Sequence, residues 1–324
     1  MSFDLTVLVP AYKAKYLGEL LLALNSQTLP PARIVLSDDS PDQAFVQALG
    51  NSATRAAYPK LNIEVIPGPR QGAWANFRHL LQHYQGETEF FHLQLDDDIP
   101  YPHFYEQHAR AHQLVQGSCA VSRRWTAQES GQPTASLPVP AVVAAQPQRL
   151  CTLSADLLFQ QTILPTSNWL GEFSNATFRA GMREELLNTR LAGVSFTGLE
   201  DIGAFLVASQ QAPLIFINEH LGYFRTSAEQ NTSQTSGRIF KLGLLAWIAL
   251  ALSARRLGYL NTEQSTAVAR RIAAMVLQHY PAEAGMCEIA QLAANVDVSP
   301  ADEAAYLAAW HAYCGADQTQ GCTA

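Results

Sequence analysis

The first hundred residues alternate short apolar strands with helical segments, and this alternation constrains the fold more than any other feature of the chain. Strand patterns cover residues 5–9, 33–36, 61–66 and 90–95, and helical spacing covers residues 16–25, 42–49 and 73–84. Strands that are separated by helices need right-handed crossover connections, so the pattern predicts an α/β fold with a mostly parallel central sheet flanked by helices. Such sheets bind ligands at the carboxyl ends of their strands.

The rest of the chain is less regular up to about residue 237. Residues 126–148 are rich in Ser, Pro, Ala and Gln and are predicted to form a loop or a partly mobile insertion. A helix is expected to begin near Leu199, and a strand to cover residues 214–217. From Arg238 onward the pattern is helical, with breaks at Gly258, Pro281 and Pro300. We therefore expect a domain over residues 1–235 and a helical C-terminal extension over residues 236–324.

Composition narrows the classes of partner. The 324 residues have a formal net charge of −7 and no Lys/Arg-rich block, which argues against nucleic acid. The longest apolar stretch, residues 242–252, is too short to span a bilayer, and the chain starts directly in a strand pattern without a signal-peptide core. Five scattered cysteines without a C-x-x-C pair indicate reduced thiols. We expect a cytoplasmic protein, and a peripheral contact with the inner face of the membrane stays open.

Three adjacent carboxylates, Asp96, Asp97 and Asp98, follow the last of these strands. Like charges at a strand end repel one another, and folded proteins rarely keep them together without a cation. Oxygen ligands suit Mg²⁺ or Mn²⁺, which usually share their coordination with substrate phosphates. The alternative is a solvated acidic turn.

Two further acidic pairs have both a functional and a structural interpretation. Asp38 and Asp39 follow the second strand, where they could accept hydrogen bonds from a nucleoside or cap the next helix. Glu200 and Asp201 stand at a predicted helix start, where Asp201 could act as a general base or both could simply interact with the helix dipole.

Six short segments, taken in order, resemble the family 2 glycosyltransferases of the GT-A fold. They are Val-Leu-Val-Pro-Ala-Tyr at 7–12, Ser-Asp-Asp-Ser at 37–40, Gly-Ala-Trp-Ala-Asn at 72–76, Leu-Asp-Asp-Asp at 95–98, Gly-Leu-Glu-Asp at 198–201 and Gly-Tyr-Phe-Arg at 222–225. The resemblance covers about residues 3–235. It implies a Rossmann-like GT-A domain that moves a sugar from a nucleotide-diphosphate donor to an acceptor hydroxyl with inversion, in the synthesis of cell-surface polysaccharide or glycoconjugate. The implied partners are a UDP-, GDP- or dTDP-sugar and a saccharide or lipid-linked acceptor.

The same resemblance assigns roles to individual residues. Asp201 would be the catalytic base with Glu200 beside it, and Asp96, Asp98 and His220 would hold Mn²⁺ or Mg²⁺. The implied nucleotide-binding residues are Pro10, Ala11, Tyr12, Asp38, Asp39, Arg70, Asn76, Asp96 and Arg225.

Several of these positions keep a structural alternative. Arg225 could pair with a nearby acid instead of a diphosphate, and a lone histidine at a strand end such as His220 is more often structural. Lys13 replaces the Asn that is common at this position in the family. His108 and His112 are spaced i, i+4 on a predicted helix but lack the Glu of a metalloprotease, so we interpret them as structural.

Two other functions remain as alternatives. One is a nucleotidyltransferase on a related sheet, although residues 10–13 lack the glycines of its phosphate loop. The other is a non-catalytic module that binds a nucleotide or a sugar.

Overall fold

The structure, a computed structural model, describes residues 3–227, 234–297 and 299–315. The chain divides into two compact units. The first consists of Met1–Ser154, Trp169–Leu187 and Ala208–Ser227, and the second of Ala155–Asn168, Asn188–Val207 and Ala228–Ala324.

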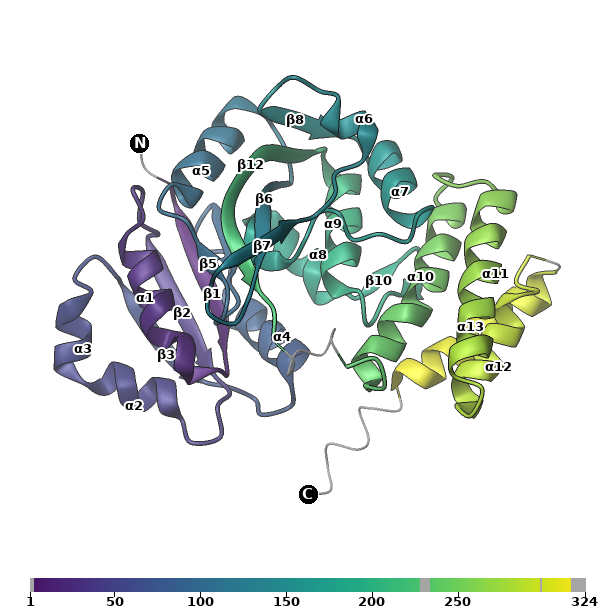
Figure 1. The fold of residues 1–324 in the computed structure, drawn as a ribbon, viewed down its shortest axis with the longest axis horizontal. Helices are drawn as coiled ribbons and strands as arrows, with labels where there is room; N and C mark the ends of the chain where they lie inside the picture. Colours follow the sequence, from purple (N-terminus) through teal and green to yellow (C-terminus); the bar gives the residue numbers. More distant parts are fainter. Residues whose placement is uncertain (1–2, 228–233, 298, 316–324) are drawn as a thin grey trace. The chain divides into compact units, whose positions relative to one another are not determined.

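The first unit is built on one sheet with the strand order β3-β2-β1-β4-β9-β6-β12-β5, to which β7 adds on β6 and β8 on β12 (Figure 1). Its strands are β1 Leu5–Ala11, β2 Arg33–Asp38, β3 Ile63–Pro67, β4 Phe90–Leu93, β5 Ile99–Pro100, β6 Cys119–Ala127, β7 Pro133–Ser136, β8 Leu150–Leu153, β9 Ala176–Arg179 and β12 Leu214–Arg225. β9 is antiparallel to both β4 and β6, so β3, β2, β1, β4, β6 and β12 all run in one direction. The prediction of a mostly parallel sheet is confirmed.

Helices connect and cover these strands (Figure 1). In the first unit they are α1 Leu17–Asn25, α2 Ala44–Gly50, α3 Ser52–Ala57, α4 Ala73–His83, α5 Phe104–Leu114, α6 Ala141–Ala144 and α8 Arg183–Leu187, with short 3-10 turns at Ala14–Tyr16, Phe173–Asn175 and Ala180–Met182. Every residue of β1 is buried, as expected for a parallel strand between two neighbours, and Leu20 and Leu24 of α1 belong to the same core. The strands and helices predicted for the first hundred residues lie within two residues of the observed ones.

Two predictions for the middle of the chain need correction. Residues 126–148 are not one loop, because they contain β7, which pairs antiparallel with β6, and the short helix α6. β7 is largely exposed and is held by backbone pairing, so its side chains give no apolar alternation. The strand predicted over residues 214–217 extends to Arg225, through two register shifts against β6 that disturb the period of two.

The second unit is mostly helical. It contains α7 Ala155–Ile163, the two-stranded pair of β10 Arg190–Leu191 and β11 Val194–Ser195, the first part of α9 Glu200–Gln211, and the helices α10 Arg238–Arg256, α11 Thr262–His279, α12 Ala284–Ala293 and α13 Pro300–Gly315. The predicted breaks at Gly258 and Pro281 fall between these helices, and Pro300 is the first residue of α13. The middle of α10 is buried, including Trp247. None of the helices in the described ranges is long and apolar enough to cross a membrane.

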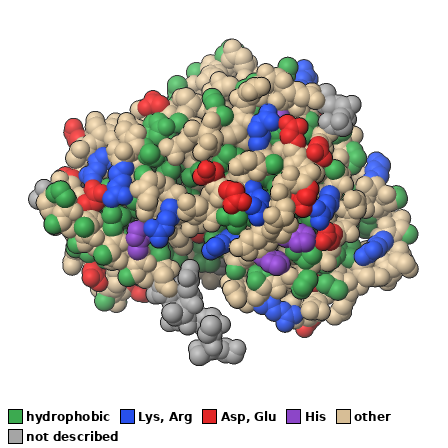
Figure 2. Space-filling view, turned by 180° about the vertical axis from the view of Figure 1, so that it is seen from behind, with side chains coloured by type: hydrophobic (Ala, Val, Ile, Leu, Met, Phe, Trp, Pro, Cys, Tyr) green, Lys and Arg blue, Asp and Glu red, His purple; other side chains and the backbone are tan. Residues whose placement is uncertain are grey.

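Surface charge is mixed. On the face seen in Figure 2, Lys and Arg side chains are interspersed with Asp and Glu side chains. The cysteines of the described part, Cys119, Cys151, Cys287 and Cys314, are free thiols.

Three buried histidines, one on β4 and two on α5, form hydrogen bonds that connect α5 to the sheet of the first unit. His92 of β4 lies between the Tyr105 hydroxyl, 3.1 Å from its Nδ1, and the Ser174 carbonyl, which is 3.0 Å from its Nε2. His108 and His112 both hydrogen-bond to the Thr177 hydroxyl, at 2.9 and 3.0 Å. Their i, i+4 spacing therefore serves one shared hydrogen-bond partner, in agreement with the structural interpretation.

We predict that His112→Gln makes stability less sensitive to acid. Burial, helped by the charge of Arg179, lowers the pKa of His112 to about 3. A histidine of the unfolded chain has a pKa of about 6.5, so below that pH the unfolded chain binds more protons than the folded one. The contribution of neutral His112 to the free energy of unfolding is therefore complete above pH 6.5 and is lost as the pH falls. Urea unfolding at pH 7.5, 6 and 5 should show the variant gaining about 1.4 kcal/mol on the wild type for each pH unit below 6.5.

His279→Gln is the matched control, because His279 is exposed near the end of α11. Its free energy of unfolding should follow that of the wild type at every pH. A constant difference between His112→Gln and the wild type from pH 7.5 to 5 would contradict the prediction.

Candidate functional site

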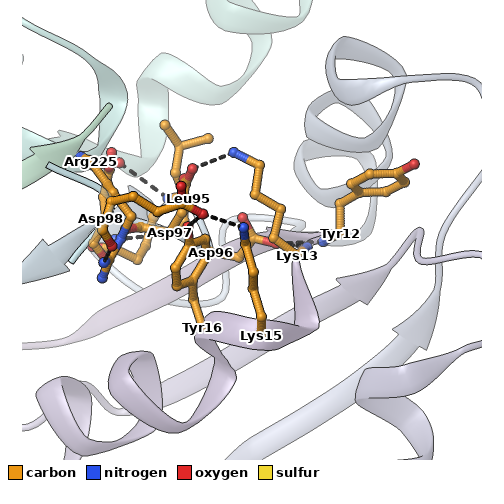
Figure 3. Close-up of polar contacts among 12 residues, drawn as sticks. Tyr12, Lys13, Lys15, Tyr16, Leu95, Asp96, Asp97, Asp98 and Arg225 are labelled. Atoms are coloured by element: carbon orange, nitrogen blue, oxygen red, sulfur yellow. Dashed lines mark hydrogen bonds and ion pairs between the residues drawn. The ribbon is translucent and has the colours of Figure 1, made fainter. Parts of the chain in front are cut away.

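Parallel pairing brings the carboxyl ends of β1, β2 and β4 to one edge of the sheet. Ala11 pairs with Asp38, and the Gln94 amide donates to the Leu8 carbonyl at 2.9 Å. The turn after β1, the acidic pair after β2 and the acidic run Asp96–Asp98 after β4 therefore lie at the same edge. The structure thus brings together the main part of the site that was predicted from the sequence (Figure 3).

The acidic run is buried, and the chain itself supplies most of the compensation. Asp96, Asp97 and Asp98 are 4%, 5% and 1% exposed. Asp96 Oδ2 accepts hydrogen bonds from the backbone amides of Tyr12 at 2.6 Å and Lys13 at 2.5 Å. Burial, followed by the charge of Asp97, nevertheless raises the pKa of Asp96 to about 6. The carboxylate of Asp97 forms an ion pair with the Lys13 ammonium group.

Asp98 is the most deeply buried member of the run, and its two carboxylate oxygens differ in their contacts. Its Oδ1 accepts a hydrogen bond from the Arg225 amide at 3.0 Å, whereas its Oδ2 is buried without a hydrogen-bond partner. Burial, followed by the charge of Asp97, raises the pKa of Asp98 well above its usual range, although the Ser174 hydroxyl and the Arg225 amide act against this rise. A buried carboxylate oxygen with no partner is costly unless a cation or a proton is bound to it.

Arg225 holds the acidic run from the side opposite to Lys13 in the view of Figure 3. Its Nε donates to the Asp97 carbonyl at 2.9 Å, and its guanidinium also donates to the Glu129 carbonyl. The same guanidinium forms an ion pair with Glu19 at 2.6 Å and lies 4.2 Å from the centre of the Tyr16 ring. Arg225 therefore pairs with an acid, as in the structural alternative. The guanidinium side chain is buried at 1% exposure, whereas the Glu19 side chain is 51% exposed.

A small cavity adjoins Asp98. It offers about 10 Å³ for the centre of a water molecule, which is room for one small occupant. The residues that line it are Asp98, Ile99, Arg124, Glu172, Ser174, Asn175, Gly222, Tyr223 and Phe224. Glu172 forms a two-point ion pair with Arg124, with N–O distances of 2.8 and 2.6 Å. The sequence offered no signal for this lining, because the segment 172–175 reaches Asp98 only through the pairing of β9 with β4.

One group at this cavity suits a hard divalent cation. It is the Oδ2 atom of Asp98, a buried carboxylate oxygen without a hydrogen-bond partner. No group of three or more acidic, histidine or cysteine side chains in the described part of the chain is arranged to hold a metal. One carboxylate is nevertheless enough where waters and substrate phosphates complete the coordination, as is usual for Mg²⁺.

The acidic pair at the end of β2, which is predicted to contact a nucleoside, has hydrogen-bond partners within the chain. Both oxygens of Asp38 accept hydrogen bonds from within the chain, Oδ1 from Ser40 and Oδ2 from the Phe45 and Val46 amides at 3.1 and 2.9 Å. These contacts are those of the alternative interpretation, an Asp/Ser turn that caps the following helix. Asp39 Oδ1 accepts a hydrogen bond from the Arg70 amide.

The remaining nucleotide candidates of the first unit lie around this edge. Pro10 and Ala11 are buried within β1, whereas Tyr12 is 59% exposed and its ring points away from the carboxylates in Figure 3. Arg70 has a positive φ of 56° and contacts the edge through its amide, so its side chain is not what ties it to Asp39. Asn76 is buried and donates to the Ser37 carbonyl at 3.1 Å, which supports the end of β2.

The contacts of His220 are with residues outside the acidic run. Its ring stacks on Trp125, with centres 3.9 Å apart, and its Nε2 lies 2.7 Å from the Ser136 hydroxyl. Burial, helped by the charge of Arg123, lowers the pKa of His220 to about 4, so it is neutral at pH 7. These contacts suit the structural alternative and give the predicted metal role no support.

Glu200 and Asp201 begin α9 in the second unit. Glu200 accepts a hydrogen bond from the Gly198 amide at 2.8 Å, and burial raises its pKa. Gly198 has a φ of 99°, and a Cβ there would lie 2.5 Å from the backbone nitrogen of Gly243 on α10. Glycine is therefore required where the segment 198–201 packs against α10. Asp201 accepts from the Asn168 amide at 3.4 Å and from the Ile202 amide at 2.8 Å.

Solved structures share this fold. The chain is similar to S. aureus TarS, with a TM-score of 0.57 and 16% identity over 97% of this chain, and it spans only 54% of the length of that structure. A shorter form of TarS, residues 1–349 in complex with UDP-GlcNAc, also has a TM-score of 0.57, with 15% identity. This alignment covers 98% of the present chain and 92% of the TarS chain. The mannosyltransferase PcManGT from Pyrobaculum calidifontis, in complex with GDP-Man and Mn²⁺, has a TM-score of 0.51 and 14% identity, with 99% and 88% of the two chains covered.

At these identities the structural likeness shows the fold alone, and the search of curated proteins found no match. Residues 6–160 match the family model described as glycosyl transferase family 2. This match includes β1, β2, β4 and the acidic run, which are the elements that form the site. Residues 6–160 therefore belong to glycosyl transferase family 2, and the fold is of the GT-A type.

Proposed function

We propose that this protein is an inverting glycosyltransferase that moves a sugar from a nucleotide-diphosphate donor to an acceptor hydroxyl. The observation that carries the proposal is the buried Oδ2 of Asp98, which has no hydrogen-bond partner and lies at the carboxyl edge of a parallel sheet, beside a small cavity. Such an edge is where α/β sheets bind their ligands, and such an oxygen is a ready ligand for a cation.

Asp98 would hold Mn²⁺ or Mg²⁺, with the donor phosphates and waters as its other ligands. When bound, the cation would neutralise the charge that develops on the departing diphosphate. Asp96 keeps the turn after β1 in place through the amides of Tyr12 and Lys13, so its role at the site is to shape the edge. The exposed ring of Tyr12 is available to stack on a nucleobase.

The transfer itself needs an acceptor oxygen and a base. We propose Asp201 as the group that takes the proton from the acceptor hydroxyl while the oxygen attacks the anomeric carbon. Attack from the face opposite to the diphosphate inverts the anomeric centre in one displacement, so no enzyme nucleophile is required. The assignment of Asp201 rests on the resemblance of residues 198–201 to the Glu-Asp pair of the family.

The family and the structural neighbours support a nucleotide-sugar donor. TarS forms a complex with UDP-GlcNAc, and PcManGT forms one with GDP-Man and Mn²⁺. We propose a UDP-, GDP- or dTDP-sugar as donor and a saccharide or lipid-linked acceptor, in the cytoplasmic synthesis of a surface polysaccharide or glycoconjugate.

We predict that Asp98→Asn weakens the binding of a nucleoside diphosphate at least tenfold in the presence of Mn²⁺ and has little effect without it, because the amide cannot neutralise the cation. Calorimetric titration with UDP, GDP and dTDP, each with and without Mn²⁺, measures both affinities. Asp156→Asn is a control, since Asp156 lies on α7 of the second unit. Equal metal-dependent affinity in Asp98→Asn and the wild type would refute the assignment of Asp98.

We predict that Asp201→Asn binds the donor as the wild type does but loses at least a hundredfold in transfer rate, because general-base catalysis contributes about 10²–10⁴-fold. The measurement is the formation of glycosylated product and free nucleoside diphosphate from the donor that binds in the titrations above. Normal turnover by the variant would exclude Asp201 as the base. Release of pyrophosphate instead would identify a nucleotidyltransferase, and donor binding without any turnover by the wild type would identify a binding module.

A further inference from the structure

Lys13 is the residue of the site that departs from the family pattern, and its contacts are specific. Its ammonium group pairs with Asp97, while its backbone amide donates to Asp96 Oδ2 at 2.5 Å (Figure 3). Asp97 is 7% exposed at its side chain and Lys13 is 26% exposed, so the pair is shielded from water on the side of the carboxylate.

The other cationic side chains nearby have different acidic partners. The Arg225 guanidinium pairs with Glu19 and donates to the carbonyl of Asp97. Lys15 pairs with Glu129 in an exposed ion pair. Lys13, by contrast, supplies positive charge directly to the carboxylate of Asp97.

A cation at Asp98 would be next to the position that this ammonium group holds. Asp97 and Asp98 are adjacent in the chain, and like charges repel strongly in a buried site, where the effective dielectric constant is low. Burial by itself would lower the pKa of Lys13, but the Asp97 hydrogen bond and the charges of the three aspartates outweigh burial and raise this pKa. The ammonium group therefore keeps its charge.

We propose that Lys13 is a built-in counter-ion of the acidic run, which competes with the divalent cation for the charge of Asp97 and so sets the cation concentration at which the site fills. Without the cation, Lys13 keeps the buried run partly neutralised and attached to the end of β1. With the cation, part of this attraction is lost, because Asp97 then faces two positive groups. The inference rests on the proposed cation site at Asp98.

The test is titration of the protein with Mn²⁺ alone, followed by the electron paramagnetic resonance signal of free Mn²⁺. Lys13→Met keeps the aliphatic length and removes the charge, so we expect its dissociation constant for Mn²⁺ to be about tenfold lower than that of the wild type. Lys13→Arg keeps the charge and should stay within about twofold of the wild type. Lys15→Met removes a charge from the same turn without touching the run, and it should also stay within about twofold.

Lys13→Asn serves as a second variant in case Lys13→Met does not fold, which circular dichroism would reveal. Unchanged or weaker Mn²⁺ binding in the folded charge-removing variant overturns the inference, and so does an equal gain in Lys15→Met. Absence of Mn²⁺ binding in both the wild type and the charge-removing variant overturns it together with the cation site. Because no donor or acceptor is present, a gain in Mn²⁺ affinity supports the inference even if sugar transfer is not found.

Discussion

The burial of three adjacent carboxylates at the end of β4 is the constraint on which the site depends. Taking a charged carboxylate out of water costs several kcal/mol unless other groups compensate for it. The compensation comes from two amides after β1, one ammonium group on Lys13, and the amide of Arg225 at the end of β12. These contacts link three strands that are distant in the sequence, so the charge balance of the run also fixes the edge of the sheet.

The compensation is uneven, and the unevenness gives the site its chemistry. Asp96 is bound by two backbone amides and Asp97 by a side-chain cation, whereas one oxygen of Asp98 has no partner. A site that compensated all three acids fully would be inert toward a cation. Arg225 adds rigidity, because its guanidinium has four hydrogen-bond partners within the chain and does not turn toward a ligand without losing them.

Much of this arrangement was predictable from local patterns. Buried parallel strands and the helices between them have clear periodicities, so the first hundred residues and the C-terminal helices were predicted closely. The partners of individual polar side chains were not predictable in the same way. Asp38 ends a strand as a ligand would, yet its Oδ2 caps α2 and its Oδ1 accepts from Ser40. His220 stands at a register shift, where it stacks on Trp125. A strand such as β7, which is held by backbone pairing and exposed side chains, leaves little trace in the sequence.

The sequence by itself determined the order of the elements, the parallel sheet and the position of the acidic run at the end of a strand, because hydrophobic periodicity and chain connectivity are local properties. Only the tertiary structure decided which carboxylate oxygen stays open, that Arg225 is buried against Glu19, and that segment 172–175 lines the cavity at Asp98. Those outcomes depend on which groups share a small buried volume, and residues that are 79 to 127 positions apart compete there for the same few hydrogen bonds and charges.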